Sequence, residues 1–127
     1  HVKIGVVAGD GGAVIWPQLI GYAKAKEYLM TGDPIDAQAA ERMGLINHVT
    51  EPEETLAKAQ AFAKRLADGP TAAIRGTKIS ANIGLKQLAH SIMDTSLAHE
   101  WLCFDGPDHR EAVTAFLEKR EPKFTER

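Results

Sequence analysis

The sequence has a single cysteine, Cys103, and no long apolar run. One thiol cannot form an internal disulfide, and neither it nor the histidines stand at a spacing typical of a zinc site. No apolar stretch approaches the roughly 18 residues that a membrane span needs, and the N-terminus lacks the charged segment and apolar core of a signal peptide. These absences lead us to expect a cytoplasmic protein without a bound metal.

Neither sign of charge dominates the chain. It has 15 Lys and Arg against 17 Asp and Glu, a formal net charge of -2. Such a balance provides no general field to gather nucleic acid or to coat an anionic membrane, so we expect neither as a partner. An anionic ligand must therefore meet locally placed cations. With 127 residues, 44% of them hydrophobic, the chain is long enough for one core and one domain.

The first eight residues, His1 to Ala8, are rich in β-branched and apolar side chains. They predict a short buried strand that runs into the glycine cluster Gly9 to Gly12. Leu45 to Val49 resembles a second, short edge strand. A lone strand cannot satisfy its own backbone hydrogen bonds, so we expect the first strand to pair with strands outside this chain, and an upstream portion to carry them.

Most of the remaining sequence has helical periodicity. Asp36 is placed to cap one helix, Gly44 to end it, and Asp108 to cap the last helix. In the segment from Ala72 to Ile83, small residues such as Gly76 lie on one stripe and allow a close helix neighbour. Helices are predicted at Ala13–Ile20, Tyr22–Met30, Asp36–Met43, Pro52–Ala67, Ala72–Ile83, Leu85–Cys103 and from Asp108 through Leu117.

The glycine cluster Gly9-Asp-Gly-Gly12 lies at the predicted junction of strand and helix. Backbone N–H groups at a helix start attract anions, so the cluster is a candidate phosphate cradle. It lacks the Lys-Ser/Thr of a P-loop and the third glycine of a dinucleotide fingerprint, and Pro17 interrupts the following helix. A tight turn that needs positive backbone torsions is the alternative interpretation.

A longer pattern surrounds this cluster. Ile4-Gly-Val-Val-Ala-Gly-Asp-Gly-Gly12 is followed by a helix ending Leu29-Met-Thr-Gly32, then by Ile35-Asp-Ala-Gln-Ala-Ala-Glu-Arg-Met-Gly-Leu-Ile-Asn-His-Val49, and later by Phe116-Leu-Glu-Lys-Arg-Glu-Pro-Lys-Phe124. This succession resembles the second half of crotonases, the enoyl-CoA hydratase/isomerase family.

The resemblance implies an α/β fold, the ClpP/crotonase-like spiral, of which this chain holds mainly the C-terminal helices with one or two short strands. Residues 1–50 would be the end of the spiral core, and residues 51–127 a helical region that mediates trimers, often stacked into hexamers. It also implies that the thioester oxygen of an acyl-CoA sits between two backbone N–H groups, which stabilise an enolate-like charge. Both donors and the first catalytic glutamate of the family belong to the upstream half.

Two residues of this half are candidate acid/base groups. His1 stands where the family's hydratases have their second catalytic glutamate, a departure that places two-glutamate hydration in doubt. An imidazole would be a different proton-transfer partner, and a structural role is the alternative. Asp10 lies in the glycine turn, where it is placed either to act as a base and orient water or only to satisfy backbone N–H groups.

Other positions match the family's substrate-binding regions. Trp16 follows the turn where the family lines its acyl pocket, and Trp101 and Phe104 flank a helix break that completes the acyl or pantetheine pocket; a core or interface role is the alternative. Lys119 matches a lysine that meets a coenzyme A phosphate, with Arg120 and Lys123 nearby, or is simply part of a solvated basic end. The candidate substrate-binding set is Gly9, Gly11, Trp16, Trp101, Phe104 and Lys119.

The function that this resemblance implies is an acyl-CoA-processing enzyme of fatty acid metabolism, a hydratase (lyase) or isomerase that works as a homotrimer or hexamer. No resident cofactor is expected, because coenzyme A enters as part of the substrate. Activity would require the upstream half. The alternative is a non-catalytic oligomerisation or CoA-binding module, since the family's catalytic glutamates are absent from these residues.

Overall fold

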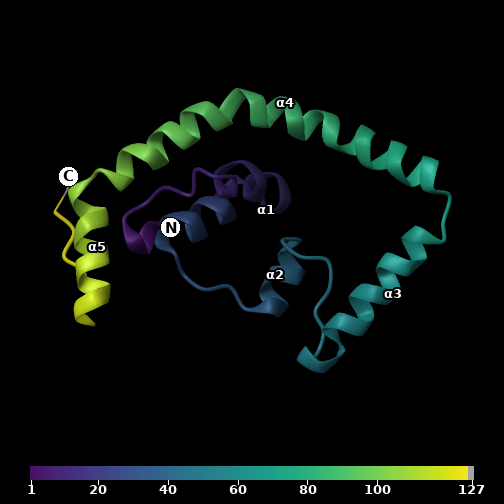
Figure 1. Ribbon diagram of the computed structural model, residues 1–127, viewed down its shortest axis with the longest axis horizontal. Coiled ribbons are helices and arrows are strands. Elements are labelled where there is room, and N and C mark those ends of the chain that lie inside the picture. The colour runs from purple at the N-terminus through teal and green to yellow at the C-terminus, as the bar shows by residue number, and fades with distance from the viewer. Residues whose placement is uncertain (126–127) are drawn as a thin grey trace.

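The computed structural model describes residues 1–125 as an open arrangement of helices. A long helix arches over the others, with shorter helices descending from each of its ends (Figure 1). A sheet is absent from residues 1–125. The elements in chain order are η1 (Val2–Ile4), α1 (Gly12–Thr31), α2 (Ala37–Met43), η2 (Pro52–Glu54), α3 (Thr55–Ala67), α4 (Thr71–Phe104) and α5 (Pro107–Glu118).

The prediction of one or two strands was wrong for the described residues. The stretch from His1 to Ala8 forms the short 3₁₀ helix η1, which ends at Gly5 with φ 69°, and then an extended segment without a partner strand. Leu45 to Val49 is likewise irregular. A strand exists only where a neighbouring strand takes up its backbone groups. Here local backbone bonds, such as those from Ile4 and Val6 to the carbonyl of His1, take up some of these groups, and the carbonyl oxygen of Ile4 lies 2.7 Å from the ring Nδ1 of His109.

The boundaries around α1 and α2 follow the sequence closely. α1 contains a break at Gly21 (φ 77°, ψ 156°), so it consists of two helical segments, as predicted. α2 begins where Asp36 accepts a hydrogen bond from the backbone N–H of Ala39 at 2.6 Å, and it ends at Gly44 in the left-handed conformation. The local capping chemistry of this region was therefore readable from the residues themselves.

Two expectations for the later helices were wrong. The segments predicted separately on either side of Gly84 form one helix of 34 residues, because a glycine inside a helix weakens it by only about 1 kcal/mol without ending it. α5 has Gly106 rather than Asp108 at its N-cap, and Asp108 accepts a hydrogen bond from the backbone N–H of Thr125 at 2.9 Å instead. None of the helices within residues 1–125 is long and apolar enough to cross a membrane.

The small core lies where α1 contacts η1 and α4, and where α5 contacts η1 and α4. Its members are small, and Val14 is the largest side chain that is fully buried. The described chain exposes 9717 Å² of surface. A compact monomer of similar mass exposes about 6,600 Å². The buried apolar residues are Val6, Ala8, Val14, Ala25, Ala40, Ala112 and Ala115.

Candidate functional site

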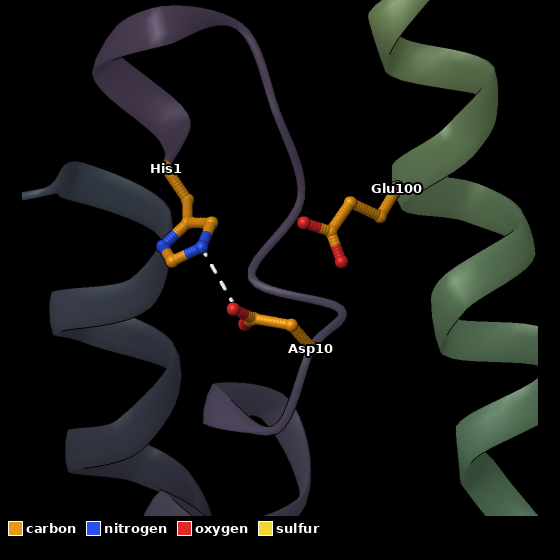
Figure 2. A group of neighbouring side chains, drawn as sticks. All are labelled: His1, Asp10 and Glu100. Carbon is orange, nitrogen blue, oxygen red and sulfur yellow. Dashed lines mark ion pairs between the residues drawn. The ribbon is translucent and has the colours of Figure 1, made fainter.

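Three ionisable side chains from distant parts of the sequence meet beside the glycine turn. His1 precedes η1, Asp10 lies in the turn before α1, and Glu100 projects from α4 toward the other two (Figure 2). The Nε2 atom of His1 lies 3.4 Å from Oδ1 of Asp10. One side-chain atom from each of the three residues lies within 4.8 Å of the other two. The structure thus brings together both predicted acid/base residues and adds a third.

The third residue, Glu100, was missed by sequence reasoning. It approaches the turn because Gly9 has no side chain: a Cβ atom on Gly9 would lie 2.8 Å from Cβ and 2.9 Å from Oε2 of Glu100, and would also collide with the carbonyl of Ser96. Oε2 of Glu100 is buried and has no hydrogen-bond partner in the described part of the chain. In the sequence, Glu100 is simply a carboxylate near the end of a long predicted helix. Its position beside the glycine turn depends on how α4 packs on that turn.

Asp10 is paired with His1 rather than with the turn that holds it. Both side chains are partly open to solvent, with 44% of His1 and 59% of Asp10 exposed. Within residues 1–125 the turn is closed by backbone hydrogen bonds, including those from Val14 and Ile15 to the carbonyl of Gly11 at 3.0 and 2.9 Å. Gly11 itself has φ 144°, a conformation that favours glycine.

The group of His1, Asp10 and Glu100 also has the composition of a metal site. An imidazole and two carboxylates suit several divalent ions, and their spacing is compatible with one. Exposed acidic groups commonly lie this close without a metal. The expectation that the protein holds no metal stays a prediction.

Two of the three predicted substrate-binding aromatic residues, Trp101 and Phe104, contact each other in the structure. The rings of Trp101 and Phe104 pack edge to face, with centroids 6.2 Å apart, and Phe104 packs in the same manner on His109 at 5.1 Å. Trp101 is 72% exposed. Trp16 is half-buried in the first turns of α1. The exposed ring of Trp101 is available to a ligand or to another polypeptide segment.

An apolar cleft of about 740 Å³ opens among η1, α1 and α5. Its walls include residues of the segment after η1, such as Val6 and Val7, together with Met30 of α1 and Phe124 near the C-terminus. Lys26 and Asp108 supply charge at its surface. None of the predicted substrate-binding residues lines this cleft, which the sequence did not indicate.

The predicted phosphate-binding lysine lies at the end of α5. Lys119 caps the helix in the left-handed conformation (φ 54°), and its side chain is exposed. Its neighbour Arg120 is committed elsewhere, with Nη1 2.5 Å from Oε1 of Glu111 and Nε 2.6 Å from Oε2 of Glu118. The hydrogen bond from Arg120, and a second from the backbone N–H of Lys123, lower the pKa of Glu111 to about 2. Of the two neighbours Lys119 and Arg120, Lys119 is therefore the cation available to a ligand.

Comparison with known proteins identifies the family. The model of the enoyl-CoA hydratase/isomerase family matches residues 1–127, so the chain belongs to that family, within the crotonase superfamily. A crotonyl-CoA hydratase of Syntrophomonas wolfei is 38% identical over 124 residues, which are 98% of this chain and 48% of that protein.

Solved structures of the family share the fold. An enoyl-CoA hydratase/isomerase from Mycobacterium paratuberculosis superposes with a TM-score of 0.84 and 40% identity, over 90% of this chain and 45% of that one. A carnitinyl-CoA hydratase from Mycobacterium avium gives 0.90 and 28%, over 99% and 49%. The crotonase-like fold is thereby confirmed. The chain spans about half the length of these relatives.

Proposed function

We propose that the polypeptide containing this chain is an acyl-CoA-processing enzyme that stabilises the enolate of a thioester, and that these residues form its C-terminal half. The match to the enoyl-CoA hydratase/isomerase family over residues 1–127 carries the proposal. The relatives' names include a crotonyl-CoA hydratase and short-chain-enoyl-CoA hydratases, which favours a short enoyl-CoA as substrate. The site beside the glycine turn supplies groups suited to moving a proton.

The proposed roles of the residues follow the family resemblance, except for Glu100, whose role follows from its position in the structure. Backbone N–H groups from residues outside this chain would hold the thioester oxygen, and donors of that kind each lower the barrier by a few kcal/mol, about 2.7–4 kcal/mol where measured in other enzymes. Asp10, His1 and Glu100 would handle protons, and Lys119 would meet a coenzyme A phosphate. Without the oxyanion donors this chain alone would be inactive. The unusually large exposed surface supports this division, because much apolar area is left uncovered.

Two acyl-CoA substrates test the proposal. The natural polypeptide that contains this chain would be purified and offered crotonyl-CoA and a 3-enoyl-CoA. Hydration of crotonyl-CoA lowers the absorbance of its conjugated double bond, whereas isomerisation of the 3-enoyl-CoA raises it. The 127-residue chain alone is the control and should do neither. If the natural polypeptide leaves every acyl-CoA unchanged, the proposal is wrong.

We expect no resident metal or cofactor, and a homotrimer or hexamer in the cytoplasm. Dialysis against a chelator should leave the hydration rate unchanged, with the metal content measured before and after. A loss of activity that Mg²⁺, Mn²⁺ or Zn²⁺ restores would show instead that His1, Asp10 and Glu100 hold an ion.

A non-catalytic oligomerisation or CoA-binding module is the second candidate function. The exposed apolar side chains of α3 and α4 favour it, because helices with such faces pack on other helices. This candidate predicts that the 127-residue chain forms a stable oligomer that binds coenzyme A by itself. Sedimentation that finds only aggregate or an unfolded monomer would contradict it.

A further inference from the structure

Glu100 is held at the site by packing rather than by hydrogen bonds. Ser96 and Glu100 are one helical turn apart on α4 and both face the glycine turn, where the missing side chain of Gly9 lets the helix approach. Ser96 is buried, and so is Oε2 of Glu100. A buried carboxylate oxygen without a donor is unfavourable, and native proteins keep few of them unless they serve a function.

The two carboxylates of the site differ in what they contact. Asp10 is paired with the imidazole of His1, whereas the carboxylate of Glu100, a partly exposed residue, has no hydrogen bond or ion pair within residues 1–125. A general base needs a free acceptor within hydrogen-bond reach of the proton that it takes. Glu100 meets that requirement better than Asp10, and Figure 2 shows its carboxylate directed toward the other two side chains.

The separation of the carboxylates suits a single water molecule. Their oxygens lie within 4.8 Å of each other. A water that donates both protons at about 2.8 Å and a tetrahedral angle spans roughly 4.6 Å between its two acceptors. Asp10 and Glu100 are thus spaced to hold one water between them, while His1 fixes the side chain of Asp10.

We propose that Glu100 is a catalytic base for hydration, with Asp10 orienting the water and His1 positioning Asp10. This assignment rests on the proposed function, and it specifies hydration as the reaction of the enzyme. His1 stands at the position of the family's second catalytic glutamate, and the proposed pair of carboxylates comes instead from the glycine turn and from α4.

The proton balance requires no further reagent. As the water oxygen bonds to the β-carbon of the enoyl thioester, one water proton passes to the carboxylate of Glu100, and the electron pair of the double bond moves onto the α-carbon and thioester oxygen. The same proton then passes from Glu100 to the α-carbon. One water has been added, and the carboxylate is restored.

Steady-state kinetics with crotonyl-CoA test the assignment, using the natural polypeptide that contains this chain. We expect Glu100→Gln to lower kcat at least 100-fold with KM changed less than threefold, because general-base catalysis contributes 10²- to 10⁴-fold. Glu100→Asp should recover part of the rate, since it keeps the carboxylate. Asp94→Asn, an exposed carboxylate on the same helix, is the matched control and should leave kcat unchanged.

Two additional measurements separate catalysis from folding. Glu100→Gln should keep the melting temperature of the unaltered protein and its affinity for butyryl-CoA, a saturated analogue that cannot be hydrated. A kcat for Glu100→Gln within threefold of the unaltered protein would overturn the assignment and leave the proposed function standing. The assignment would also be overturned if the unaltered protein isomerised a 3-enoyl-CoA but hydrated nothing. The same would hold if Glu100→Gln lowered the affinity for butyryl-CoA together with kcat. If the unaltered protein acts on no acyl-CoA, both proposals fall.

Discussion

The two ends of the described chain differ in how far they cover their own apolar surface. At the site end, η1, the glycine turn, α1 and α5 enclose most of the buried residues. At the other end, α3 has no buried residue, and the only one on α4 is Ser96, near the site. Apolar side chains stand exposed along this second end: Leu56, Phe62, Leu66, Ile79 and Ile83.

The two ends differ because close backbone approach is possible at one of them and not at the other. At the site end, glycines let segments approach: a Cβ atom on Gly5 would lie 2.8 Å from the backbone of Asp108 and His109. Close backbone packing fixes the relative positions of residues from both ends of the sequence. The helix α3 instead keeps a stripe of apolar residues that only another surface can cover. Close packing fixes side-chain positions at the site end, whereas α3 has no buried residue in the described chain.

The largest effect should follow from charges on the uncovered face of α4. Ile79 and Ile83 are 62% and 53% exposed in this chain. If another segment covers them in the natural polypeptide, Ile79→Glu with Ile83→Glu should cost at least about 2 kcal/mol per site and disperse its oligomer. Sedimentation velocity measures this outcome. Lys86→Glu on the same helix is the control, and an intact oligomer of the double variant would show that this face stays in water.

A smaller effect is expected from alanine substitutions at Gly9, which contacts α4, and at Gly76, which belongs to α4, and the two should change stability in opposite directions. Gly9→Ala forces the turn away from Glu100 and Ser96, and should lower the free energy of unfolding by about 1–3 kcal/mol and kcat by at least tenfold. Gly76→Ala places its methyl group in open space, and should raise the stability by about 0.5–1 kcal/mol.

Denaturant unfolding and crotonyl-CoA turnover measure both glycine variants. Equal effects would show that the close approach at Gly9 does not hold the site. If Gly76→Ala lowered the stability instead, another helix would have to pack closely against the small-residue stripe of α4.

The smallest effect concerns the C-terminal tail and its dependence on pH. The hydrogen bond from Arg120 lowers the pKa of Glu111 from 4.5 to about 2, so this ion pair stabilises the fold above about pH 4.5 and loses that contribution as the pH falls toward 2. Glu111→Gln should therefore lower the melting temperature slightly at pH 7, and the difference from the unaltered protein should shrink between pH 4.5 and 2. A difference independent of pH would contradict this assignment.

Local chemistry made much of this structure predictable. Asp36 caps α2 as expected, Gly44 ends it, and the break at Gly21 falls between the two predicted helical segments. These features depend on a few neighbouring residues, so a short stretch of sequence specifies them. Of the two interpretations of the glycine cluster, the structure shows the turn, with Gly11 at φ 144°. Asp10 and His1 were both named as candidate acid/base groups, and the structure places them side by side.

The errors share one cause, which is dependence on distant partners. The apolar opening residues have strand propensity, but no strand within residues 1–125 pairs with them. Two separate helices were expected on either side of Gly84, yet α4 is continuous through it. Glu100 was overlooked because its importance comes from its approach to Gly9, which no periodicity or motif encodes.

Residue types at short, ordered spacings were enough to indicate the family, the cap of α2 and the glycine turn. The approach of Glu100 to Asp10 and His1, and the uncovered apolar face of α3, became visible only in the folded chain. Packing brings residues together that are far apart in the chain, and contact between such residues depends on the whole fold rather than on any local pattern.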